Sequence, residues 1–132
     1  MSKVISIVGS RRRDSDRDET LVWNAFMEVY EEGDAICSGL CSQGADRFAV
    51  RFAKLLNAPT FWFPADWKLE GKQAGFNRNT HIAMKSDVLI ACVAKDRIGG
   101  TEDTIRKFMR LKGVKNLIIV KSEQDLEDHD ES

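Results

Sequence analysis

Residues 87–104 read DVLIACVAKDRIGGTEDT, and this stretch decides the class of fold. Its first part, Asp87–Val93, is short and almost entirely apolar, as is typical of a strand buried on both faces of a parallel sheet. Apolar residues then recur at helical spacing over 105–112, which predicts a helix. Gly99 and Gly100 lie in the loop between the two. A buried strand followed by a glycine-containing loop and a helix is the repeating unit of an α/β fold.

The same unit recurs along the rest of the chain. Four further strands are predicted at Lys3–Val8, Ala35–Ser38, Thr60–Phe63 and Asn116–Val120. Three further helices are predicted over Asp18–Glu32, where Gly33 ends the helix, from Ala45 to about Asn57, and from about Ala74 to Lys85, with a polar loop at 65–73. This alternation predicts an α/β fold, a Rossmann-like three-layer α/β/α domain with a five-stranded parallel sheet of order 3-2-1-4-5.

The composition limits the function. The chain has 132 residues and a formal net charge of −1, with 20 basic and 21 acidic side chains. This length predicts one domain, residues 1–121, followed by an acidic and flexible tail at 122–132. Near-neutral charge disfavours a protein that coats nucleic acid or an anionic membrane, so any anion site must be local. No segment approaches the roughly 18 apolar residues of a membrane span, and we expect a cytoplasmic protein.

The cysteines give no sign of a metal centre. Cys37, Cys41 and Cys92 lack the paired spacing of a zinc site, with or without His81. Nothing in the spacing supports a nucleophilic Cys41–His81 pair either. We therefore expect reduced cysteines, no metal ion and no cofactor.

Three glycine-containing loops follow predicted strands one, two and four, and they read VGSRRR, SGLCSQGAD and AKDRIGGTED. The carboxyl ends of parallel strands meet at one edge of a sheet, so these loops should converge there. Glycine lets backbone N–H groups approach a ligand, and each following helix adds positive charge at its N-terminus. The candidate ligand-binding residues, including those at the start of the third helix, are Gly9, Ser10, Arg11, Ser38, Gly39, Gly44, Ala45, Asp46, Gly75, Arg78, Asn79, Gly99, Gly100, Thr101 and Glu102.

Each candidate also has a purely structural interpretation. Arg11 and its neighbouring arginines could solvate a loop, and Asp46 could cap its helix. Arg78 could lie on a solvated surface. Thr101 is expected to cap the last helix with its hydroxyl group while nearby N–H groups face a ligand. Among the aromatic residues, Trp67 is the one expected to reach a ligand.

Several separated motifs occur in the order seen in one known family. The segments VGSR, SGLCSQGADRFA, FPADWKLEGKQAGFNRNTHIA and SDVLIACVAKDRIGGTEDTIRKF together resemble the YspA/YpsA-type branch of the SLOG superfamily. That superfamily joins the SMF/DprA DNA-uptake proteins with the Lonely Guy enzymes, and the resemblance covers Val4 to Val120. It implies a Rossmann-like domain that binds a nucleotide or a nucleotide-derived ligand, in a bacterial or phage setting.

The Lonely Guy enzymes release a base from a nucleoside 5′-monophosphate, and the resemblance to them rests on few residues. Their pattern has an Arg-Lys pair nine residues before the aspartate that opens strand four. Arg78 has this spacing to Asp87, whereas Asn79 replaces the lysine.

The loop after strand four departs from the same pattern. With Gly100 and Thr101 aligned, the position of the catalytic glutamate falls on Thr104, so a catalytic carboxylate would come from Glu102 or Asp103. In this enzyme hypothesis the catalytic residues are Arg78, Glu102 and Asp103.

The first hypothesis is therefore a binding or sensing module for a nucleotide or a nucleotide-derived ligand. The alternatives are a nucleotide N-glycosidase of the phosphoribohydrolase type and a single-stranded DNA binding protein, which the near-neutral charge disfavours. The superfamily's members often pair, and Trp23 and Phe52 are predicted on exposed helices, so a homodimer is the expected partnership.

Overall fold

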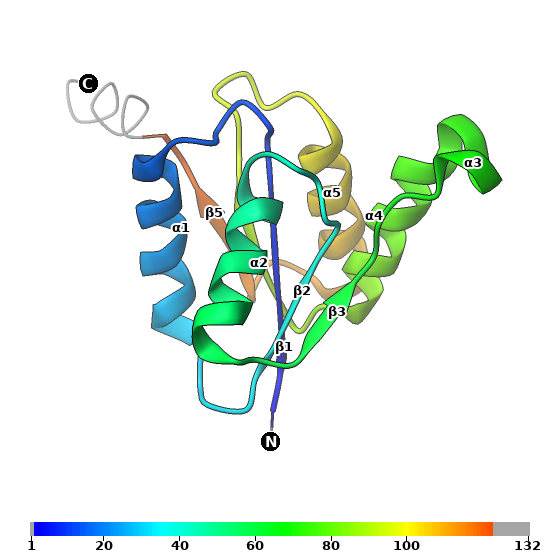
Figure 1. Ribbon diagram of the computed structural model, residues 1–132. Coiled ribbons are helices and arrows are strands. Elements are labelled where there is room, and N and C mark those ends of the chain that lie inside the picture. The colour runs from blue at the N-terminus through cyan, green and yellow to red at the C-terminus, as the bar shows by residue number, and fades with distance from the viewer. Residues whose placement is uncertain (1, 123–132) are drawn as a thin grey trace.

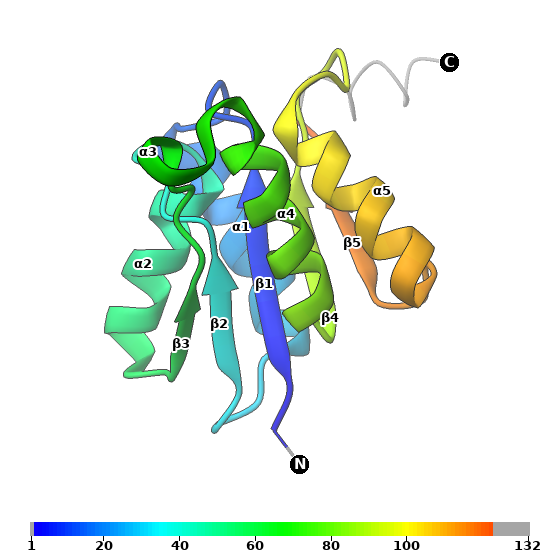
Figure 2. The ribbon, with the colours of Figure 1, turned by 90° about the vertical axis from the view of Figure 1, so that its right-hand side faces the viewer.

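The computed structural model describes residues 2–122, and a parallel sheet lies at its centre. The five strands are β1 (Val4–Gly9), β2 (Ala35–Ser38), β3 (Thr60–Trp62), β4 (Val88–Cys92) and β5 (Leu117–Val120). They pair in the order β3-β2-β1-β4-β5, and every pairing is parallel (Figure 2). The predicted fold class and strand order are confirmed.

Helices cover both faces of the sheet. α1 (Asp16–Val29) and α2 (Ala45–Leu56) lie on one face, whereas α4 (Ala74–Lys85) and α5 (Gly100–Lys112) lie on the other (Figure 1). Each face has its own apolar cluster, because residues on buried strands point alternately to opposite sides. Phe26 and Phe48 belong to the first cluster, and Ile82 and Phe108 belong to the second.

Gly9 ends the central strand at a point of close packing. A Cβ atom placed on it would lie 2.8 Å from the Cβ of Ala45 and 2.9 Å from the carbonyl oxygen of Cys92. Only glycine therefore lets α2 begin directly beside β1 and β4, and the loops after these strands are brought together.

The segment at 65–73 is not the loop that its polar composition predicted. It forms the short helix α3 (Trp67–Glu70) and the 3₁₀ turn η1 (Gly71–Gln73). The Asp66 side chain caps α3 by accepting a hydrogen bond from the backbone N–H of Leu69 at 3.0 Å. α3 lies beyond the carboxyl ends of the strands, next to the start of α4 (Figures 1 and 2).

The first helix also ends earlier than predicted. Its last residue is Val29, and Tyr30 already has an extended backbone with φ of −73° and ψ of 133°. Gly33 has φ of +95° and lies in the turn that leads into β2, so it does not end the helix.

The described chain contains no helix that is both long and apolar enough to cross a membrane. The predicted acidic tail lies outside the described residues, apart from Ser122. Cys37 and Cys92 are buried among strands, and burial raises the pKa of their thiols to about 11 and about 12.

Candidate functional site

A cavity of about 470 Å³ opens at the carboxyl edge of the sheet. The loops after β1 and β4 form part of its wall, and α3, α4 and the first turns of α2 and α5 complete it. Eleven of the predicted ligand-binding residues line this cavity, namely Gly9, Ser10, Arg11, Asp46, Gly75, Arg78, Asn79, Gly99, Gly100, Thr101 and Glu102. Segments far apart in the sequence thus converge on one concave site, at the place where parallel α/β folds bind their ligands.

Cys41 of the loop after β2 lines the cavity, whereas the residues that were predicted to contact a ligand there support it from outside. Ser38 is fully buried, and its hydroxyl group donates to the carbonyl oxygen of Ile7 at 2.6 Å. Gly39 accepts a hydrogen bond from Arg78. Gly44 is the N-cap of α2 and donates its N–H to Asp14 at 2.6 Å, whereas Ala45 is buried against Gly9. These four residues were predicted to contact a ligand, but they do not line the cavity.

Arg78 is held in place by polar contacts to its own surroundings. Its Nε donates to Oδ1 of Asn79 at 2.9 Å, and its Nη1 donates to the carbonyl oxygen of Gly39 at 3.0 Å. Nη1 also lies 3.8 Å from the sulfur of Cys41. A guanidinium group has five N–H donors, and these contacts use the one on Nε and the two on Nη1, so the two on Nη2 remain for a ligand in the cavity. The Nη2 donors and the guanidinium charge suit recognition of a phosphate or carboxylate oxygen.

Asp46 places a buried carboxylate in the same wall. The residue is 5% exposed, and its Oδ2 accepts a hydrogen bond from the backbone N–H of Cys41 at 3.1 Å. Burial raises the pKa of the Asp46 carboxyl above its ordinary value, although that N–H and the nearby Arg78 charge oppose the rise. The interpretation of Asp46 as a helix cap is wrong, because Gly44 is the N-cap of α2 and no side chain caps this helix. Asp46 instead links the loop after β2 to the cavity.

The cavity wall is positively charged although the whole chain is not. Four basic and two acidic side chains line it, namely Arg11, Arg12, Lys72, Arg78, Asp46 and Glu102. Within residues 2–122, Arg11 and Lys72 have no ion-pair partner. Arg12 is held by Asp96 through two hydrogen bonds of 2.7 Å, which lower the pKa of the Asp96 carboxyl to about 2. The local excess of positive charge favours an anion.

The N-terminus of α5 also faces the cavity. Its N-cap is Gly99, with φ of +128°, and no side chain caps the helix. The prediction that the Thr101 hydroxyl caps it is wrong. Gly99 is the N-cap residue, and Thr101 already lies inside the helix. Gly99, Gly100 and Thr101 all line the cavity, so this helix end adds partial positive charge there.

The two predicted catalytic carboxylates have different surroundings. Glu102 lines the cavity and accepts a hydrogen bond from Nε of Arg97 at 2.8 Å. Asp103 is not part of the wall, and its Oδ2 accepts from Nδ2 of Asn79 at 3.1 Å and from Nζ of Lys107 at 2.8 Å. Asp103 thus holds Asn79 in position from behind.

Two aromatic residues in and near α3 contribute to the apolar part of the wall. Trp67 is 57% exposed and Phe76 is 52% exposed, and both line the cavity together with Ile98. Gly75 permits this arrangement, because a Cβ atom there would lie 3.3 Å from the Trp67 ring. Trp67 was predicted to reach this region.

Sequence reasoning did not select several other wall residues, namely Val8, Arg12, Cys41, Lys72, Phe76, Ile82, Ala94, Ile98 and Thr104. No pattern marks most of them. Lys72 and Phe76 flank the predicted start of the third helix and lie within four residues of Gly75, a predicted site residue. Their closeness to Gly75 in the sequence is the signal that could have identified them.

Arg13 has a role that the arginine-rich sequence does not indicate. It is 5% exposed and donates to Asp18, to the carbonyl oxygen of Val93 at 3.1 Å and to that of Val120. Arg13 therefore ties the loop after β1 to the ends of β4 and β5. With Arg12 paired to Asp96 as well, the segment offers fewer free cations to single-stranded DNA than its sequence indicates.

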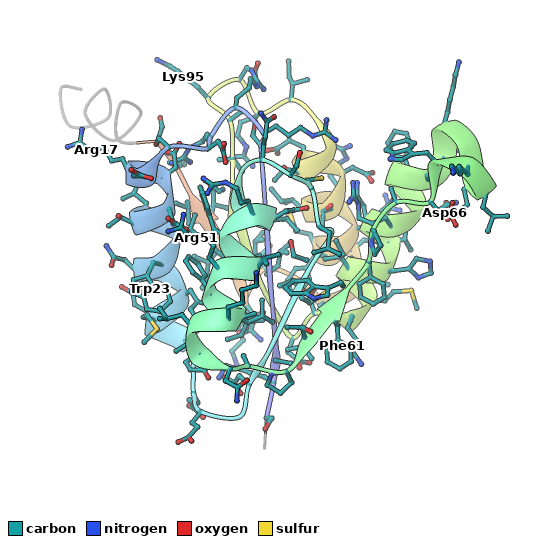
Figure 3. The ribbon with its side chains drawn as sticks, viewed as in Figure 1. Arg17, Trp23, Arg51, Phe61, Asp66 and Lys95 are labelled. Atoms are coloured by element: carbon teal, nitrogen blue, oxygen red, sulfur yellow. The ribbon has the colours of Figure 1, made fainter. Side chains whose placement is uncertain are left out.

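Trp23 and Phe52 are not the exposed pair that was expected. Phe52 is 4% exposed, and the two rings pack edge to face with centroids 4.8 Å apart. Trp23 and Arg51 lie on the neighbouring helices α1 and α2 (Figure 3) and help to line a second hollow of about 390 Å³. The predicted homodimer stays a prediction.

No protein-family model matches the chain, and no protein with a curated function matches it either. Among solved structures, the chain is similar to the molybdenum cofactor binding protein from the phototrophic bacterium Rippkaea orientalis. The two are 19% identical, the TM-score is 0.69, and the match covers 98% of this chain and 84% of the other. Likeness at this identity establishes the shared fold. Membership of the SLOG superfamily stays a prediction.

Proposed function

We propose that this protein binds a nucleotide or a nucleotide-derived small molecule in the cavity and acts as a binding or sensing module. The observation that carries the proposal is the convergence of cations on one concave site. Arg11 and Lys72 have no ion-pair partner among residues 2–122, and Arg78 keeps the two N–H donors of Nη2 for a ligand. Together with the N-terminus of α5 they form a site for phosphate.

The aromatic wall supports a ligand with a planar ring. Exposed apolar patches often mark ligand-binding grooves, and Trp67 and Phe76 are both about half exposed in the cavity wall. A heterocyclic base stacked on an aromatic side chain gains about 1–3 kcal/mol. A phosphate at the cationic wall and a base against Trp67 would together account for the mixed polarity of the site.

The structural neighbour supports a small-molecule ligand. Its name states that it binds the molybdenum cofactor. The organic part of that cofactor and a nucleotide share a phosphate group and a planar heterocycle. A phosphorylated pterin therefore belongs among the compounds to be tested alongside nucleotides.

One observation keeps the nucleotide N-glycosidase as the second candidate. Two carboxylates, Glu102 and Asp46, line the cavity together with Arg78. Such hydrolysis passes through an oxocarbenium-like sugar, which a carboxylate can stabilise. Incubation with nucleotides followed by chromatography and mass spectrometry would reveal released base, and loss of release in Arg78→Ala would establish the enzyme.

Binding is tested with the purified full chain and a panel of nucleoside mono-, di- and triphosphates, dinucleotides and a phosphorylated pterin. We expect at least one compound to raise the thermal midpoint and to bind in calorimetry. Arg78→Ala should weaken that binding at least tenfold, whereas Arg110→Ala, which removes an exposed arginine near the end of α5, should not. Equal binding by wild type and Arg78→Ala would show that the site is misplaced.

A further inference from the structure

Resting on the proposed function, we further propose that Asp46 recognises the sugar hydroxyl groups of the ligand. The cavity should therefore select ribonucleotides over their deoxy forms. Among residues 2–122, Asp46 is the one carboxylate that both lines the cavity and is more than nine-tenths buried. A buried carboxylate with an incomplete set of donors is a strong acceptor for a ligand's hydrogen-bond donors.

The set of donors around Asp46 is incomplete. Oδ2 accepts a hydrogen bond from the backbone N–H of Cys41, and the Cys41 thiol is a second donor to the carboxylate, which offers about four acceptor positions. The nearby Ser38 hydroxyl has a single proton, which goes to the carbonyl oxygen of Ile7. Arg78 contributes its charge but no ion pair within 4.0 Å in the described chain. A ligand in the cavity can therefore supply the missing donors.

The surroundings of Asp46 point to the sugar rather than to the phosphate or the base. A carboxylate repels phosphate, which belongs at the cations. Asp46 nevertheless lies within electrostatic range of Arg78, so its donor must come from the part of the ligand next to the phosphate. In a nucleotide that part is the ribose, and its neighbouring 2′- and 3′-hydroxyl groups can both donate to one carboxylate. The base is left to Trp67 and Phe76.

The experiment compares ribonucleoside 5′-monophosphates with their 2′-deoxy and 3′-deoxy forms for all four bases, by calorimetry on the full chain. Asp46→Asn is the test variant, since its amide oxygen can still accept from the Cys41 N–H. Glu28→Gln is the matched control, because Glu28 is an exposed carboxylate on α1. Circular dichroism and the thermal midpoint establish that each variant is folded.

Wild type and Glu28→Gln should bind the ribo form about 10- to 100-fold more tightly than the deoxy forms, as expected for a site that hydrogen-bonds a hydroxyl group. Asp46→Asn should reduce this preference to about threefold or less while it retains binding that depends on phosphate. Equal binding of ribo and deoxy forms by wild type would overturn the inference about Asp46 and leave the proposed function standing. A change in base preference in Asp46→Asn would do the same. If no nucleotide binds to wild type at all, the proposed function fails as well.

Discussion

Gly39→Ala should displace Arg78, the arginine proposed to bind the ligand, without damaging the fold. A Cβ atom at this position would lie 2.3 Å from Nη1 of Arg78 and 3.0 Å from its Cδ. These distances are far below ordinary van der Waals contact, so the Arg78 side chain must move. The backbone of Gly39 is not left-handed, and alanine can adopt it without strain.

The effects on stability nearly cancel. The variant loses the hydrogen bond from Arg78 to the Gly39 carbonyl, which is about 1 kcal/mol. Alanine lowers the entropy of the unfolded chain, and this gains about 0.4–1 kcal/mol. The displaced arginine can extend into the open cavity, so no core atom shifts. We therefore expect the free energy of unfolding to change by less than about 1 kcal/mol.

The effect on binding is larger. A charge-assisted hydrogen bond between a guanidinium group and phosphate is about 1.5–3 kcal/mol, which is a 10- to 150-fold change in Kd. Calorimetry with the tightest nucleotide of the panel measures this change, and urea unfolding measures the stability. Gly113→Ala is the contrasting control. Gly113 has φ of +77° and lies away from the cavity, so alanine there should reduce stability by about 1–2 kcal/mol and leave binding unchanged.

A double-mutant cycle decides whether Arg78 carries the effect. Gly39→Ala should weaken nucleotide binding in wild type and have almost no further effect in Arg78→Ala, because the displaced side chain is then absent. Additive losses would refute the reasoning, as would a Gly39→Ala protein that binds as tightly as wild type.

Three further predictions concern stability and are measured by urea or thermal unfolding. Gly9→Ala should destabilise the protein by about 1–3 kcal/mol, because its Cβ would meet backbone and buried atoms that cannot move. Adding Ala45→Gly to this variant should recover part of the lost stability, and an unchanged unfolding midpoint in Gly9→Ala would contradict the prediction. Arg13→Ala should reduce stability by about 3 kcal/mol, since it leaves Asp18 and two strand-end carbonyl groups without their hydrogen-bond donor. A loss of stability below about 1 kcal/mol would show that water replaces the Arg13 side chain. Asp46→Asn should stabilise the ligand-free protein by about 1 kcal/mol at pH 7, because it removes a buried charge. The pKa of Asp46 is raised in the folded protein, so the charged carboxylate opposes folding once the pH rises through that pKa. The gain in stability of Asp46→Asn over wild type should therefore be larger at pH 8 than at pH 4.

The strand order was predictable because it follows from local patterns and general rules of chain connection. Short apolar runs such as Asp87–Val93 mark strands buried on both faces, and right-handed crossovers then fix their order. The convergence of the glycine loops followed from the same geometry. Gly9, Ser10 and Gly99 were selected for this reason, and each lies at the cavity.

What the sequence did not reveal depends on contacts between distant segments. In the sequence, Arg13 looks like one of several surface arginines. In the structure it is buried and donates hydrogen bonds to carbonyl groups at the ends of β4 and β5. Ser38 looks like a ligand contact, yet its hydroxyl faces Ile7 inside the sheet. The helix at Trp67–Glu70 is too short for helical periodicity, although its cap, Asp66, is visible in the sequence.

The burial of Asp46 and the freedom of Arg11 and Lys72 have a common explanation in the proposed function. A ligand with a phosphate at one end and neutral hydroxyl groups next to it would give Arg11 and Lys72 the partner that they lack among residues 2–122, and would add donors to Asp46. Residues chosen only for stability would instead pair with one another, as Arg12 and Asp96 do at the cavity rim. The protein thus keeps a destabilising carboxylate and unpaired cations within one wall, which is the pattern expected where stability is sacrificed for binding.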